Sequence, residues 1–169
     1  MDVRNLLSDL FGRVDEHVDE VLDGLDTASL TRQPGPATNP IGWLVWHVAR
    51  VEDAQIAELL GDDQLWVDGP YAARFGLEPD PNNHGYGHTP ADVAAVRPDG
   101  VDALLDYSRA VRARTDEFLA TLTPDDLDRI VDEAWDPPVT MGVRLISVVD
   151  DQIQHLGAAA YVKGLLQQS

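Results

Sequence analysis

The sequence predicts an all-α protein, a four-helix bundle with a long connection between its second and third helices. Two observations support this fold class. Four long segments carry apolar residues at three- and four-residue steps, the spacing of one face of an α-helix. An irregular stretch of almost forty residues, broken by glycine and proline, separates the second segment from the third. The length of 169 residues predicts a single domain, residues 1–169, with a sizeable core.

The first predicted helix covers residues 2–24, where valine, leucine and phenylalanine recur at helical spacing. His17 falls among acidic residues on its polar side, so we expect a solvated surface histidine rather than a ligand. Residues 26–38 contain Pro34, Gly35 and Pro36 and are predicted to form a loop.

The second predicted helix opens with Asn39 as its cap and Pro40 in its first position, and continues over residues 41–60. It is apolar on nearly every side, which indicates burial on most of its surface. His47 lies in its middle, next to Trp46. Two interpretations of His47 carry equal weight: a core histidine satisfied by one hydrogen bond, or a metal ligand that points into the bundle.

The long connection, residues 61–98, is expected to be functional or to act as a lid, because loops of this length are uncommon in compact domains. We predict short helical turns at 71–75 and at 90–95, the latter capped by Thr89. His84 and His88 are four residues apart, but the Gly-Tyr-Gly between them argues against a helix, so the spacing does not indicate chelation. Tyr86 and His88 are candidates to close over a site.

The third predicted helix runs from a cap at Asp99 through Leu122. Its arginines, Arg109, Arg112 and Arg114, are expected to be exposed and to pair with acids. A short helical turn at 123–126 and a proline-rich linker at 136–138 follow.

The fourth predicted helix covers residues 140–168, with Thr140 as its N-cap. Its predicted apolar face is formed by Val143, Ile146, Val149, Ile153, Leu156, Ala160 and Leu165. Asp151 and His155 are four residues apart, so their side chains share one face, one turn from each other. Asp150 and Gln154 point about 100° away, toward neighbouring helices. Arg144 lies near the same stripe and is expected to form a structural ion pair rather than to hold an anionic substrate.

Composition excludes several function classes. Twelve basic against thirty acidic residues give a formal charge of −18, which disfavours nucleic-acid and membrane-surface roles. Without an apolar span or a basic leader, we expect a cytoplasmic protein. The chain has no cysteine, so a thiol that takes part in its chemistry must come from outside.

A bundle brings inward-facing residues of separate helices together, which places His47 near Asp151 and His155. Two imidazoles and one carboxylate are the ligand types of an open zinc site, and the same set accepts other divalent metals. The alternative is a hydrogen-bonded network of the same three side chains without metal.

Two segments, residues 39–52 (NPIGWLVWHVARVE) and 150–157 (DDQIQHLG), resemble the DinB-like superfamily, and more narrowly its actinobacterial mycothiol-dependent branch. The resemblance implies a four-helix bundle with a metal-binding histidine in its second helix. It also implies a last helix in which a histidine follows another ligand by four residues. That ligand is usually histidine in the superfamily and glutamate in the mycothiol-dependent maleylpyruvate isomerases, and Asp151 fits the carboxylate variant with one methylene fewer.

The resemblance further implies a metal-dependent thiol S-transferase. Zinc, or alternatively nickel, would activate mycothiol or a similar small thiol for attack on a small-molecule electrophile, and homodimerisation is a family-level expectation. The isomerases carry an additional C-terminal domain, whereas this chain ends at Ser169, so a general transferase is expected instead. Two alternatives stay open: a non-catalytic metal-binding bundle, and a structural bundle with a buried histidine–aspartate network.

Overall fold

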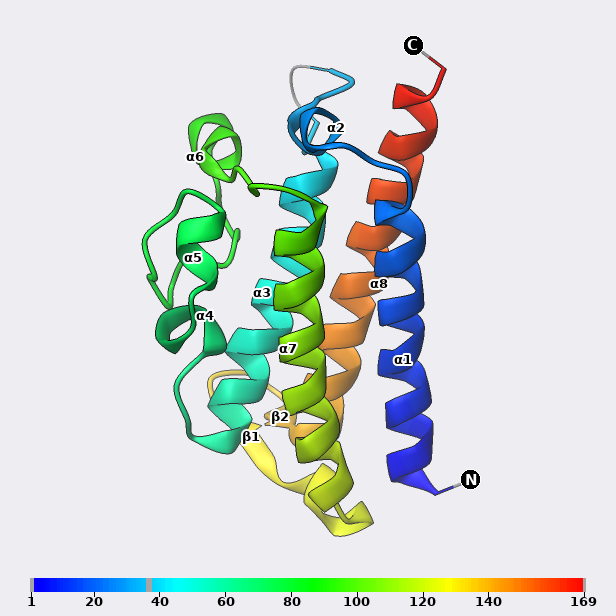
Figure 1. The fold of residues 1–169 in the computed structure, drawn as a ribbon. Helices are drawn as coiled ribbons and strands as arrows, with labels where there is room; N and C mark the ends of the chain where they lie inside the picture. Colours follow the sequence, from blue (N-terminus) through cyan, green and yellow to red (C-terminus); the bar gives the residue numbers. More distant parts are fainter. Residues whose placement is uncertain (1, 36–37, 169) are drawn as a thin grey trace.

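The computed structural model describes residues 2–35 and 38–168. Four long helices, α1 (Val3–Leu22), α3 (Ile41–Leu60), α7 (Val101–Thr121) and α8 (Met141–Leu166), form a bundle (Figure 1). α1 and α8 run in one direction, and α3 and α7 run in the opposite one. α3 packs against α7 and α8, and α1 packs against the same two helices. The predicted all-α four-helix bundle is confirmed.

The connection between α3 and α7 crosses from one end of the bundle to the other along its outside (Figure 1). It contains three short helices, α4 (Leu65–Asp68), α5 (Tyr71–Arg74) and α6 (Pro90–Ala95). The predicted turns at 71–75 and 90–95 correspond to α5 and α6, and Thr89 caps α6 through a capping box with Asp92. α4 has only four residues, too few for a periodic pattern to reveal it.

Several predicted boundaries are confirmed and others are wrong. Thr140 caps α8 by accepting a hydrogen bond from the backbone N–H of Val143. Asn39 is not the cap of α3, because that position is Pro40 and has no side-chain cap. Asp99 does not cap α7 either: Gly100 holds the cap position, and the Asp99 carboxylate pairs with Arg74 instead.

The structure adds short elements within the predicted loop 26–38 and beside the proline-rich linker, and it confirms the helical turn predicted at 123–126. α2 (Thr27–Thr31) lies in the predicted loop 26–38, capped by the Asp26 side chain, while Pro36 of that loop lies outside the described residues. The predicted turn at 123–126 is a 3₁₀ helix, η1 (Pro124–Asp128). The linker at 136–138 joins two antiparallel strands, β1 (Ile130–Asp132) and β2 (Val139–Thr140), and Ile130 pairs with Thr140.

The core lies between the four long helices, and its largest fully buried side chains include Trp46, Trp66 and Tyr107. The predicted apolar face of α8 is largely wrong: Val149 and Leu156 are buried, but Ile146 is 61% exposed. The other exposed members are Val143, Ile153, Ala160 and Leu165. The buried face is formed by Met141, Leu145, Val148, Val149, Gln152, Leu156, Ala159 and Val162. Apolar residues occur on nearly every side of α8, so their spacing alone does not select the face that packs.

The arginines of α7 differ in exposure, although all three pair with acids as predicted. Arg109 is exposed and contacts Asp19. Arg112 is buried and bonds Asp116 at 2.6 Å. The Arg114 side chain is only 14% exposed and pairs with Asp62 at 2.9 Å, so the expected exposure is wrong for both. Within residues 2–35 and 38–168, no helix combines the length and apolar character that crossing a membrane requires.

Candidate metal centre

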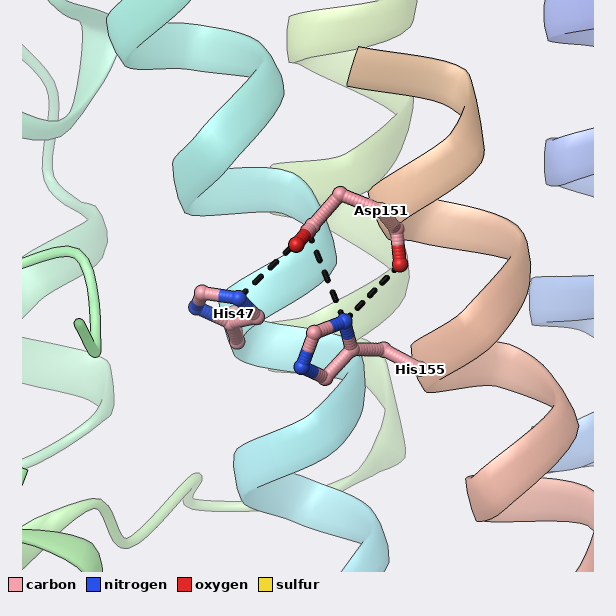
Figure 2. A group of neighbouring side chains, drawn as sticks. All are labelled: His47, Asp151 and His155. Carbon is pink, nitrogen blue, oxygen red and sulfur yellow. Dashed lines mark hydrogen bonds and ion pairs between the residues drawn. The ribbon is translucent and has the colours of Figure 1, made fainter. Parts of the chain in front are cut away.

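His47, Asp151 and His155 meet at the contact between α3 and α8 (Figure 2). His47 projects from the middle of α3, while Asp151 and His155 project from neighbouring turns of α8, so packing of the two helices brings all three together. One ligand atom from each residue can be chosen such that all lie within 4.8 Å of one another. The three residues that the sequence predicts as ligands therefore form one cluster.

The Asp151 carboxylate lies between the two imidazoles. Its Oδ2 atom is 3.4 Å from Nε2 of His47 and 3.4 Å from Nδ1 of His155. This oxygen is buried, yet it makes no hydrogen bond with any described residue. A buried carboxylate oxygen without a donor is costly, and a cation bound between these side chains would remove that cost. The donor set and its geometry thus fit a divalent metal ion.

Backbone carbonyls determine which nitrogen of each imidazole carries a proton. Nδ1 of His47 lies 2.5 Å from the carbonyl oxygen of His84, and Nδ1 of His155 lies 2.8 Å from that of Asp151. A carbonyl only accepts, so both Nδ1 atoms must donate. In the neutral rings Nε2 then keeps its lone pair, and a hydrogen bond from the other nitrogen is the usual way in which proteins orient a metal-binding histidine.

The charges within the cluster support one another. Burial acts to raise the pKa of Asp151, but the contacts with His155 and His47 outweigh it and hold that pKa below its usual range. The contact with Asp151 raises the pKa of His155, although the burial of the imidazole acts to lower it. Asp151 is therefore ionised at neutral pH, the state that a metal ligand requires.

The loop of residues 81–88 covers the outer side of His47. Gly85 adopts a φ of +104°, and a Cβ atom there would lie 2.6 Å from Nδ1 of His47 and 3.0 Å from the indole of Trp43. That indole stacks on the His47 ring, with 5.0 Å between centroids and 9° between planes. Trp43 thus serves packing, as predicted, and only glycine at position 85 allows the loop to lie this close.

Arg50, one turn beyond His47 on α3, holds the loop in place. Its guanidinium is fully buried and donates to the carbonyl oxygens of Asn83 at 3.0 Å and Pro81 at 3.2 Å. It also donates to the Tyr107 hydroxyl at 3.1 Å and pairs with Asp53 at 3.4 Å. Arg50 is not among the residues predicted to have a functional role, although an arginine within an otherwise apolar helix is a recognisable signal of one.

The two histidines of the loop contribute to the site without joining the cluster. His84 supplies its backbone carbonyl to His47. Nδ1 of His88 accepts from the indole N–H of Trp43 at 3.1 Å, and its Nε2 therefore donates to Asn83 at 2.9 Å. Tyr86 is almost fully exposed, so the expectation that it closes over the site is wrong in this structure.

Other candidates on α8 have structural roles. Asp150 and Gln154 are exposed and hydrogen-bond each other at 2.9 Å, so the expectation that they face neighbouring helices is wrong. Arg144 forms the predicted ion pairs, with Glu58 at 2.6 Å and Asp132 at 3.4 Å.

A buried carboxylate, which the sequence motifs do not predict, joins three helices beside the cluster. Glu52 of α3 accepts from the Thr115 hydroxyl of α7 at 2.6 Å and from the Gln152 amide of α8 at 2.5 Å. Burial raises the pKa of Glu52 to about 7, although both hydrogen bonds act to lower it. The network fixes the register of α3 against α8, and thereby of His47 against Asp151.

Two pockets border α8 on different faces. One, of about 440 Å³, lies between α1 and α8 and has no member of the cluster among its lining residues. Another, of about 360 Å³, is lined by Asp151 itself and lies between α3, α8 and the hairpin β1–β2. Proximity to the donor atoms makes the smaller pocket the relevant one for chemistry at the cluster.

Comparison with known proteins agrees with the fold and the motifs. The family described as the DinB superfamily matches residues 10–159. The crystal structure of a conserved protein from Enterococcus faecalis is 33% identical and covers 100% of this chain and 99% of that one, with a TM-score of 0.91. No curated protein matches the chain. The more specific resemblance to the mycothiol-dependent branch receives no support from these matches.

Proposed function

The chain belongs to the DinB superfamily, a group of helical and often metal-binding proteins, and we propose that it is a metal-dependent thiol S-transferase. The observation that carries the proposal is the buried Oδ2 atom of Asp151, which lies between two imidazoles and has no hydrogen-bond donor. A divalent cation is the partner that this arrangement suits.

His47 and His155, each through Nε2, and the Asp151 carboxylate would hold the ion. Zinc is the metal that we propose, with nickel as the alternative, because imidazole and carboxylate ligands suit both. When bound, a divalent ion supplies a Lewis acid that lowers the pKa of a coordinated thiol.

In this proposal the residues of the chain position the reactants. The carbonyl of His84 orients His47, and the loop that carries Gly85 shields the outer side of its ring from water. Because the chain lacks cysteine, the sulfur must come from a small thiol, for which we propose mycothiol or a similar molecule. In the transfer, sulfur forms a bond to the electrophilic carbon, the thiol proton passes to solvent, and the leaving group departs with its bonding electrons.

The test uses zinc-loaded protein with mycothiol and 1-chloro-2,4-dinitrobenzene, in which sulfur replaces chloride to give a coloured thioether. We expect the wild type and His17→Ala to form the thioether faster than either free zinc or the double variant His47→Ala/His155→Ala. Zinc-loaded wild type that is no faster than free zinc would reject the transferase and indicate a non-catalytic metal-binding bundle. Failure of the wild type to bind zinc would indicate a structural polar network.

A further inference from the structure

The pocket of about 360 Å³ beside the cluster is placed to receive a second reactant. Arg144, Val148 and Asp151 line it from one face of α8, at spacings of four and three residues, so the pocket follows this face to the cluster. Its volume falls within the range of about 300–1,000 Å³ that is usual for small-molecule sites. The pocket therefore leads a ligand to the Asp151 carboxylate.

The guanidinium of Arg144 is the cation among the described residues that line this pocket, and it is already engaged. Nη1 lies 2.6 Å from the Glu58 carboxylate and also bonds the side-chain oxygen of Gln55, while Nη2 lies 3.4 Å from the Asp132 carboxylate. The side chain is only 12% exposed. An incoming carboxylate or phosphate would therefore meet a guanidinium whose positive charge two acids already offset.

The charges around the pocket also disfavour an anion. Glu58 and Asp132 contact the guanidinium, and Asp151 lines the same pocket nearer the cluster. Three carboxylates against one guanidinium leave two negative charges in excess. A divalent ion at the cluster would offset this excess without reversing its sign, and the chain as a whole carries a formal charge of −18. An anionic ligand therefore gains no attraction here, whereas an uncharged ligand meets no repulsion.

Apolar groups form the remaining walls. Val51 of α3, Val139 of β2 and Val148 of α8 line the pocket together with Trp135, which lies between the two strands of the hairpin. Trp135 is 67% exposed, whereas the other three tryptophans are at most 5% exposed. An accessible indole beside valine side chains offers a flat surface on which a planar ligand can stack.

We propose that this pocket binds the electrophile of the transfer, and that it selects uncharged planar molecules and rejects their carboxylated analogues. That the bound ligand is the electrophile rests on the proposed function, whereas the preference for uncharged planar ligands does not. The pocket combines an indole surface, aliphatic walls and an arginine neutralised by acids, so charge is the property by which it discriminates.

The test measures binding without thiol or metal, using two unreactive probes that differ by one carboxylate, nitrobenzene and 4-nitrobenzoate. The full chain is freed of metal by a chelator, so that the carboxylate probe cannot bind an ion instead. Chemical shifts of the indole N–H of Trp135, assigned through Trp135→Phe, report occupancy. We expect nitrobenzene to move this signal with a dissociation constant at least about tenfold lower than that of 4-nitrobenzoate.

A double variant, Glu58→Gln/Asp132→Asn, tests the electrostatic reason. It releases Arg144 from both acids, and we expect it to bind 4-nitrobenzoate at least about tenfold better than the wild type, with nitrobenzene affinity unchanged. Equal affinity of the wild type for the two probes, no movement of the Trp135 signal, or no gain in the double variant would each overturn the proposal. None of these results depends on whether thiol transfer occurs, so the two proposals fail separately.

Discussion

Replacing Glu52 with glutamine is expected to remove a large pH-dependent contribution to stability. Glu52 is buried between Thr115 and Gln152, and burial raises its pKa from 4.5 to about 7. Glutamine keeps the shape of the network, because its carbonyl can accept from the Gln152 amide. Its own amide can donate to the Thr115 hydroxyl, which in turn reaches the carbonyl of Val111 at 3.2 Å.

The sign and size of this contribution to the free energy of unfolding follow from the raised pKa of Glu52. In the unfolded chain Glu52 releases its proton near pH 4.5, whereas the folded protein retains it until about pH 7. Between these values the folded state binds more protons, so the free energy of unfolding falls as pH rises. The difference of about 2.5 pH units corresponds to roughly 3 kcal/mol, fully lost above pH 7.

Urea unfolding of the wild type and Glu52→Gln, measured from pH 4.5 to 8, tests this reasoning. The stability of the variant relative to the wild type should rise by about 3 kcal/mol across that range. Glu117→Gln, at an exposed position of α7, serves as the control and should follow the wild type. A Glu52→Gln curve that stays parallel to the wild-type curve within about 0.5 kcal/mol would refute the assignment.

Two further substitutions test how the loop supports the cluster. Gly85→Ala should weaken zinc affinity about tenfold or more in a chelator competition, because its Cβ atom would press on His47. Gly87→Ala also has a positive φ, +74°, but no described neighbour within 4 Å of its Cβ, so an equal loss there would show that backbone strain alone is responsible. Arg50→Leu should lower the free energy of unfolding by about 3–5 kcal/mol, because the buried Asp53 carboxylate loses its partner at 3.4 Å and the carbonyls of Pro81 and Asn83 lose their buried donor. Arg13→Leu, in an exposed ion pair, should cost less than about 1 kcal/mol, and similar losses for both would contradict the anchoring role of Arg50.

The sequence is sufficient to predict the long helices and the cluster. Residues four apart in a helix lie on the same face, as Asp151 and His155 do. The helix that carries His47 is buried on most sides, so the His47 side chain has few directions other than the bundle interior. The cluster in Figure 2 follows from these two local facts and from the packing of α3 on α8.

The remainder depends on tertiary contacts that local patterns do not contain. The buried face of α8 is selected by contact with α1 and α3, so Ile146 and Ile153 are exposed although their spacing suits a core. Arg50 and Glu52 are buried because partners from distant segments satisfy them, and β1–β2 is too short to show alternation. The single domain over residues 1–169, homodimerisation and cytoplasmic location stay predictions.

The central claim is that His47, Asp151 and His155 bind one divalent metal ion, and metal stoichiometry tests it most directly. Elemental analysis would compare wild type, His17→Ala and His47→Ala/His155→Ala after incubation with zinc and removal of free metal. We predict about one equivalent of metal in the wild type and in His17→Ala, and none above background in the double variant. Equal metal in all three proteins, or none in the wild type, would contradict the claim.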